Sequence, residues 1–154
     1  MRLLRAAAAL FLLTPLACQA TEPSTRSAAG LQQVPLNIKT SVGKTHRFLV
    51  EVAATPAQQE KGLMFRTELG PDAGMIFPMV PPRHAAFWMR NTLIPLDMIF
   101  VRPDGSIARI AAMTVPHSLV PVYSGEPVAA VLEIAGGRAA ALNIKEGDLV
   151  VWKR

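Results

Sequence analysis

The chain has 154 residues, of which 16 are Lys or Arg, 11 are Asp or Glu, one is Cys and 51% are hydrophobic. That length predicts a single domain, and the hydrophobic fraction excludes an intrinsically disordered protein. The single Cys excludes a scaffold built on disulfides, and the 13 Pro and 10 Gly argue against a coiled coil or a helical bundle.

The first 20 residues have the pattern of a secretory signal sequence. Two Arg precede the apolar stretch 6–17, which is too short to span a bilayer as a helix. Two processing modes remain open. Signal peptidase would cleave after Ala20, whereas a lipobox would place a lipid on Cys18, although Pro15 stands where a lipobox usually has Leu. We therefore expect an exported protein that is periplasmic, or a lipoprotein that meets the membrane only through its lipid anchor.

Beyond the signal sequence, we expect a flexible tether, 21–33, and a single domain, 34–154. The tether is rich in Ser, Thr, Ala and Gln, and the 14 basic and 11 acidic residues left after the signal sequence are scattered, which argues against nucleic-acid binding. The three His share no metal-ligand spacing, and the chain has neither a phosphate-binding loop nor a nucleophile motif. No metal, cofactor or catalytic residue is therefore expected.

The first part of the domain has the pattern of a hairpin followed by a short helix. Apolar and polar residues alternate over 36–40 and over 48–52, which predicts two half-buried strands. From Thr55 the sequence Thr-Pro-Ala-Gln combines an N-cap, Pro at the first helical position and Gln three residues after the cap, which predicts a helix over 56–61. Residues 63–83 have no clean period and contain four Pro, which predicts mostly loop.

Short extended segments dominate the rest of the domain. We expect a helix over 138–142 and strands over 87–91, 96–102, 107–113, 128–134 and 149–152. The hairpin spanning 96–113 is expected to be central in the sheet, because its first strand is apolar on both faces apart from one Asp. The predicted fold is mainly β: a compact single-domain β-sandwich or barrel-like fold with two short helices.

Two carboxylates stand alone in apolar strands, Asp97 and Glu133. A buried carboxylate is costly unless it is paired or hydrogen-bonded, and Arg66 and Arg90 are suitable partners in this chain. We therefore expect one polar region at the edge of the sheet, made of Arg66, Trp88, Arg90, Asn91, Thr92, Asp97 and Glu133. Two interpretations remain open: a set of ion pairs that pins loops to the sheet, or a polar cleft that binds a small ligand.

Several short motifs occur in a characteristic order: Gly-Leu-Met-Phe-Arg from 62, Gly-Met-Ile-Phe from 74, Phe-Trp-Met-Arg-Asn-Thr from 87, Pro-Leu-Asp-Met-Ile-Phe from 95 and Val-Leu-Glu-Ile-Ala-Gly-Gly from 131. Over about residues 36–152 the chain resembles the bacterial and archaeal domain of unknown function family number 192. The resemblance implies a compact β-sandwich with short helices, commonly behind a signal peptide or lipoprotein anchor. It implies no established activity. The family often has Lys where Arg90 stands.

Three functions are consistent with these features. The first is a non-enzymatic accessory module of the bacterial envelope that binds a small ligand or an envelope protein. The second is a small hydrolase, acting on a sugar, in which Asp97 and Glu133 form a catalytic pair across an open cleft. The third is a structural domain that binds a protein partner through a large exposed apolar patch. The first two functions can be distinguished by the positions and the exposure of Asp97 and Glu133.

Overall fold

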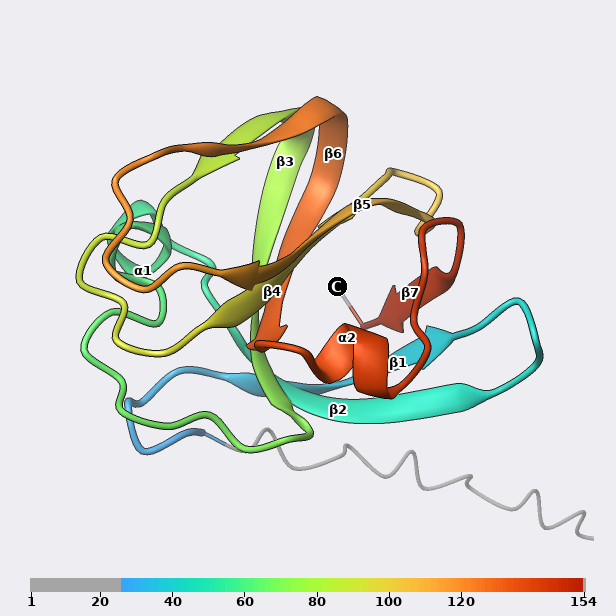
Figure 1. Cartoon of the computed structure of the whole chain (residues 1–154), viewed down its shortest axis with the longest axis horizontal. Coiled ribbons are helices and arrows are strands. Elements are labelled where there is room, and N and C mark those ends of the chain that lie inside the picture. The colour runs from blue at the N-terminus through green and yellow to red at the C-terminus, as the bar shows by residue number, and fades with distance from the viewer. Residues whose placement is uncertain (1–25, 154) are drawn as a thin grey trace, which may run out of the picture.

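The computed structural model describes residues 26–153, so the predicted signal sequence, Cys18 and the first part of the tether lie outside the described residues. Seven strands and two short helices are present (Figure 1): β1 (Gln33–Lys39), β2 (Thr45–Val52), α1 (Pro56–Lys61), β3 (Ala73–Phe87), β4 (Leu96–Val101), β5 (Ile107–Thr114), β6 (Val122–Ala135), α2 (Arg138–Ala141) and β7 (Leu149–Trp152). Neither helix of the described residues is long and apolar enough to cross a membrane.

All seven strands belong to one sheet, in the order β5-β4-β6-β3-β2-β1-β7. Neighbouring strands are antiparallel except β2 and β3, which run parallel. The two end strands meet at a bridge between Ser106 and Leu149, where the Ile107 N–H donates to the Asp148 carbonyl at 2.8 Å. The sheet therefore curls into a half-barrel (Figure 1). This confirms a mainly β, barrel-like domain with two short helices.

Each face of the curled sheet has its own apolar cluster. The inner cluster contains residues of all seven strands, and Ala139 of α2 and Ile144 complete it. The outer cluster lies on the other face of β3, β4 and β6 and is rich in Met and Phe: Met75, Phe77, Met79, Met89, Met98 and Phe100. Leu63, which follows α1, belongs to the outer cluster. Because both faces are buried, β4 is buried along its whole length.

The hairpin and the first helix form as the sequence predicts. β1 and β2 pair antiparallel, and α1 spans Pro56–Lys61. Thr55 Oγ1 accepts from the Gln58 N–H at 3.3 Å, and Gln58 Oε1 accepts from the Thr55 N–H at 3.0 Å. This reciprocal capping box sets the start of a helix that is too short to be stable in isolation.

Three expectations about the strands are wrong. Residues 63–83 are not mostly loop, because β3 begins at Ala73. Its pairing with β6 is interrupted between Pro78 and Arg83, so Pro81 and Pro82 lie where no backbone N–H is needed for pairing. No strand occupies 87–91, since β3 ends at Phe87. The β4–β5 hairpin lies at one end of the strand order and is not central.

The end of the predicted tether is part of the folded domain. Arg26 forms a bridge with Gln32, and the Ser27 N–H donates to the Leu31 carbonyl at 2.9 Å. Leu31 also packs against the outer cluster. Residues 26–32 therefore form a turn that lies against the sheet, followed directly by β1.

Candidate functional site

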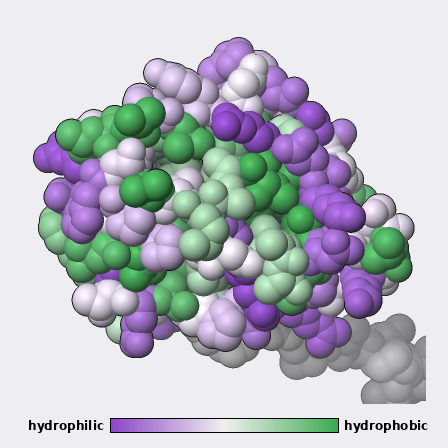
Figure 2. Space-filling model, in the orientation of Figure 1, coloured by the Kyte–Doolittle hydropathy of each residue, from purple (hydrophilic) through white to green (hydrophobic). Residues whose placement is uncertain are grey.

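A pocket of about 360 Å³ lies on the outer face of the sheet, between the end of α1, the second half of β3 and the loop that follows it. Its lining includes Gln59, Lys61, Met64, Phe77, Met79, Arg83, His84, Trp88, Thr92 and Glu133. Figure 2, drawn in the orientation of Figure 1, shows apolar and polar residues intermixed at the left of the view, where α1 lies in Figure 1. Polar residues thus interrupt the exposed apolar surface there.

Glu133 reaches this pocket through the register of the sheet. It lies opposite Met75 of β3 and Met98 of β4, so its side chain shares their face, within the outer cluster. Thioether neighbours offer no hydrogen-bond donor to a carboxyl group. The adjacent Gly74 lets the two strands approach closely, because a Cβ there would stand 2.6 Å from the Glu133 carbonyl oxygen.

Glu133 is a buried residue whose carboxyl group has no polar partner among the described residues. The residue is only 5% exposed. Within residues 26–153 its side chain takes part in no hydrogen bond and no ion pair. Burial raises the pKa of Glu133 from 4.5 to about 8, because desolvation disfavours the charged form. At neutral pH this group is therefore mostly a protonated acid facing a pocket.

Two loops form the rim of the pocket and are joined by hydrogen bonds. The Phe65 N–H donates to the Asn91 carbonyl at 2.8 Å, and Asn91 Nδ2 lies 3.9 Å from Met64 Sδ. Arg90 stacks over the Trp88 ring, with the guanidinium carbon 5.4 Å from the ring centroid. Trp88 is 46% exposed, so this cation–π pair stands at the mouth.

The wall of the pocket on the helix side is also fixed. Gln59 Nε2 donates to the Pro78 carbonyl at 2.9 Å and lies 3.2 Å from the Ala53 carbonyl, which fastens α1 to β3. Phe77 and Phe87 pack edge to face, with their centroids 5.0 Å apart. Ordered walls of this kind preorganise a pocket and reduce the entropic cost of binding.

Arg66 lies outside this pocket. It forms an ion pair with Glu51 of β2, a residue that the sequence analysis does not single out. Both line a second pocket of about 530 Å³. Glu51 lies opposite Met75 in the sheet, so Glu51 and Glu133 flank Met75 on one face, and only Glu51 has a cationic partner.

Asp97 has a purely structural environment on the opposite face. It lies opposite Ile134, the next residue after Glu133, and successive residues of a strand alternate faces. Its carboxylate accepts three backbone N–H groups, from Met113 at 2.8 Å, Gly137 at 2.9 Å and Ala139 at 2.8 Å. Asp97 thus ties β5 and the start of α2 to β4.

The predicted site is therefore only partly assembled. The structure brings Trp88, Thr92 and Glu133 to one pocket, with Arg90 stacked on Trp88 and Asn91 in the same loop. The expectation that Arg66 and Arg90 neutralise Asp97 and Glu133 is wrong. A hydrolytic pair of Asp97 and Glu133 does not fit this geometry either, because the two carboxyl groups point to opposite faces of the sheet.

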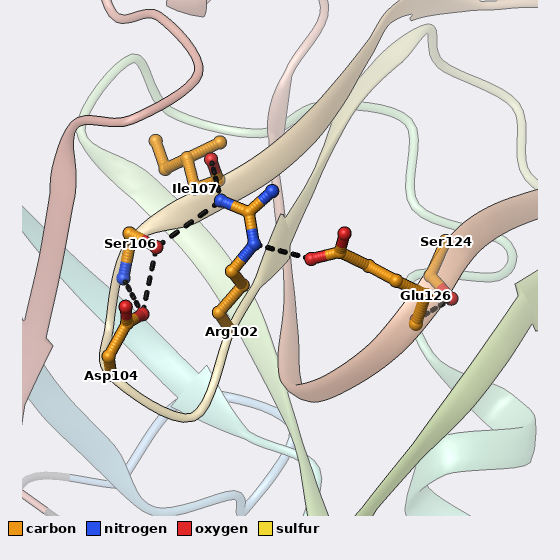
Figure 3. Close-up of polar contacts among 6 residues, drawn as sticks. All are labelled: Arg102, Asp104, Ser106, Ile107, Ser124 and Glu126. Carbon is orange, nitrogen blue, oxygen red and sulfur yellow. Dashed lines mark hydrogen bonds and ion pairs between the residues drawn. The ribbon is translucent and has the colours of Figure 1, made fainter.

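A further polar network joins the β4–β5 turn to β6 (Figure 3). Arg102 forms an ion pair with Glu126 and donates to the Ile107 carbonyl at 3.2 Å. Asp104 accepts from the Ser106 N–H at 2.9 Å, and this hydrogen bond holds the pKa of Asp104 below its usual value. Since these groups are satisfied by one another, the network is structural.

Metal binding has no support from the arrangement of the usual ligands. Within residues 26–153, no three His, Cys, Asp or Glu side chains lie close enough together to hold a metal ion. The Glu133 pocket contains His84 and Glu60 at its rim, but its interior is formed by thioether and aromatic groups.

Comparison with known proteins identifies the family. None of the curated proteins compared with the chain matches it. A crystal structure of a protein of unknown function from Novosphingobium aromaticivorans DSM 12444 is 51% identical, with a TM-score of 0.81 and coverage of 90% of this chain and 99% of that one. A crystal structure from Sinorhizobium meliloti 1021, of a protein described as a candidate transcription regulator, is 40% identical, with a TM-score of 0.78 and coverage of 79% and 95%. The profile of the DUF192 family, described as an uncharacterized ACR, matches residues 38–152, and the chain therefore belongs to that family.

Proposed function

We propose that this chain is an exported, non-enzymatic module of the bacterial envelope that binds a small ligand in the Glu133 pocket. The observation that carries the proposal is a buried carboxyl group that faces a pocket and has no partner among the described residues. Unpaired buried polar groups are costly and rare, and a strongly raised pKa in a cleft favours a functional site.

Binding is favoured over catalysis by the state of the other buried carboxylates. Asp97 and Asp148 accept hydrogen bonds from backbone N–H groups, and Glu51 is paired with Arg66. None of the three is available as the second member of an acid–base pair with Glu133. The pocket volume of about 360 Å³ lies within the usual range for small-molecule sites, at its lower end.

A thermal-shift screen of envelope metabolites tests this binding function. Glu133→Leu keeps the side-chain volume and suits the Met-rich surroundings, but removes every hydrogen bond that the carboxyl group could offer. Glu126→Leu, in the network of Figure 3, is the matched control, because Glu126 does not line the pocket and its carboxylate is paired with Arg102. We expect at least one compound to raise the Tm of the wild type and of Glu126→Leu but not of Glu133→Leu. A screen without such a compound contradicts the proposal.

Export rests on the sequence of the first 20 residues and is tested separately. Cell fractionation should find the protein in the envelope, and full-length protein left in the cytoplasm would contradict export. If Cys18 carries lipid, Cys18→Ser should release the protein from membranes, because two or more acyl chains give stable attachment. A wild-type protein that is already soluble in the periplasm and begins at Thr21 would instead establish plain cleavage after Ala20.

A further inference from the structure

The interior and the rim of the Glu133 pocket differ in charge. Glu133 is the buried ionisable group, and its surroundings are Met75, Met98 and the aromatic wall that includes Phe77. The charged groups at the rim are exposed: Glu60 and Lys61 at the end of α1, Arg83 and His84 on β3, and Arg90, which stacks on Trp88 at the mouth. No protein cation therefore lies beside the buried carboxyl group within the described residues.

The other carboxylates near Glu133 in the sheet do not change the local charge around its carboxyl group. Glu51 lies two strands away on the same face, about 10 Å by the usual strand spacing, and Arg66 compensates its charge. Asp97 faces the other side of the sheet. The missing positive charge is thus local to Glu133.

We propose that the Glu133 pocket is selective for an organic cation, an ammonium group carried on an apolar body. This inference rests on the proposed binding function and names the class of ligand. An ammonium group supplies the counter-charge that no described residue provides, and the attraction between opposite charges is stronger in a less polar environment than in water. The Met and Phe walls suit the apolar body of such a ligand. At the buried end of the pocket an anion would meet the carboxyl group of Glu133, whereas Lys61 and Arg83 lie exposed at the rim.

Binding of a cation requires the ionised form of Glu133. The carboxyl O–H bond breaks, the proton leaves to solvent, and the carboxylate pairs with the ammonium group. Since the pKa of Glu133 is about 8 in the free protein, affinity for a permanent cation should rise as the pH increases to about 8 and level off above it. A neutral ligand that accepts a hydrogen bond from the protonated acid should show the opposite trend.

Benzyltrimethylammonium and benzyl alcohol form a matched pair of probes, because they share an apolar ring and only the first carries a permanent charge. Their dissociation constants would be measured by NMR chemical-shift titration of the full mature protein at pH 6 and pH 9. We expect the cation to bind roughly tenfold or more tightly at pH 9 than at pH 6. Glu133→Gln should abolish both the preference and its pH dependence, whereas Glu126→Gln should retain both.

Each contrary result is informative. If benzyl alcohol binds as tightly as the cation at pH 9, the pocket binds small molecules but the inferred ligand class is wrong. If the cation binds to Glu133→Gln as tightly as to the wild type, the carboxyl group does not select it and the inference is also wrong. If neither probe binds, the inference fails, and the proposed binding function fails with it only when the metabolite screen is also empty.

Discussion

Asp97 and Glu133 look alike in the sequence but differ in the fold in their hydrogen bonds and in the face of the sheet on which they lie. Each is a single acid in an apolar strand, and each is buried, at 0% and 5% exposure. The Asp97 carboxylate accepts hydrogen bonds from three backbone N–H groups, whereas the Glu133 carboxyl group accepts none from the described residues. Asp97 of β4 lies opposite Ile134 of β6, the residue after Glu133. The two acidic side chains therefore lie on opposite faces of the sheet.

The difference shows that an acid in an apolar strand is not itself a functional signal. At Asp97 the surrounding backbone satisfies the charge, so the residue holds the fold together. At Glu133 thioether neighbours leave the carboxyl group unsatisfied, so folding carries a cost that a ligand could offset. The assignment of function to Glu133 depends on this difference between the two carboxyl groups. The following substitutions test whether the difference exists.

The largest expected effect is the pH dependence of stability caused by Glu133. Its pKa is raised from 4.5 to about 8 on folding, so the folded state holds a proton that the unfolded state releases between those pH values. The contribution of Glu133 to stability should therefore be largest below about pH 4.5 and be lost as the pH rises to about 8, by at most roughly 5 kcal/mol.

Urea unfolding of the wild type and of Glu133→Gln at pH 5, 7 and 9 measures this contribution, because other titrating groups cancel in the difference. The wild type should lose stability relative to Glu133→Gln as the pH increases. A difference that does not change with pH would show that Glu133 has an ordinary carboxyl environment, and the contrast with Asp97 would disappear.

The second effect concerns Asp97. Asp97→Asn keeps the shape but places an amide NH₂ where a carboxylate oxygen accepts from the Ala139 N–H. We expect a loss of roughly 2–4 kcal/mol in the free energy of unfolding, since hydrogen bonds to a charged acceptor are lost in a buried site. The equivalent amide substitution, Glu133→Gln, should cost little or should stabilise at pH 9. Equal losses for the two variants would contradict the assigned roles.

A smaller effect is expected at the other helix start. Thr55→Ala removes a cap that is local in sequence and exposed, so it should cost roughly 1 kcal/mol, less than the loss of the long-range cap that Asp97 provides to α2. Thr55→Ser is the control, because it keeps the hydroxyl group. Thermal unfolding that shows no difference between the Ala and Ser variants would mean that the capping bond does not stabilise α1.

Local patterns account for what the sequence predicts correctly. The α1 start depends on Thr55 and Gln58, which are three residues apart, and the first hairpin depends on alternation within two neighbouring strands. β3 is not predicted because its pairing with β2 and β6 is non-local, and because Pro81 and Pro82, which suggest a loop, lie where its pairing with β6 is interrupted.

The site is predictable only in part for a similar reason. A lone acid such as Glu133 can be recognised from the apolar residues around it. Its partners depend on the register between strands that are distant in sequence. In that register Arg66 pairs with Glu51, and no cation of the described residues pairs with Glu133. Glu51 itself resembles an ordinary solvent-facing residue, because it stands at a polar position of an alternating strand.

The most direct test of this account is the ionisation of Glu133 itself. A pH titration that follows the side-chain carboxyl carbon of Glu133 by ¹³C NMR, assigned by comparison with Glu133→Gln, reports the pKa of that one group. The account predicts a midpoint near pH 8, in keeping with a buried acid that faces a pocket and has no partner among residues 26–153. A midpoint near 4.5, the usual value, would contradict it by showing that the carboxylate is solvated or already paired.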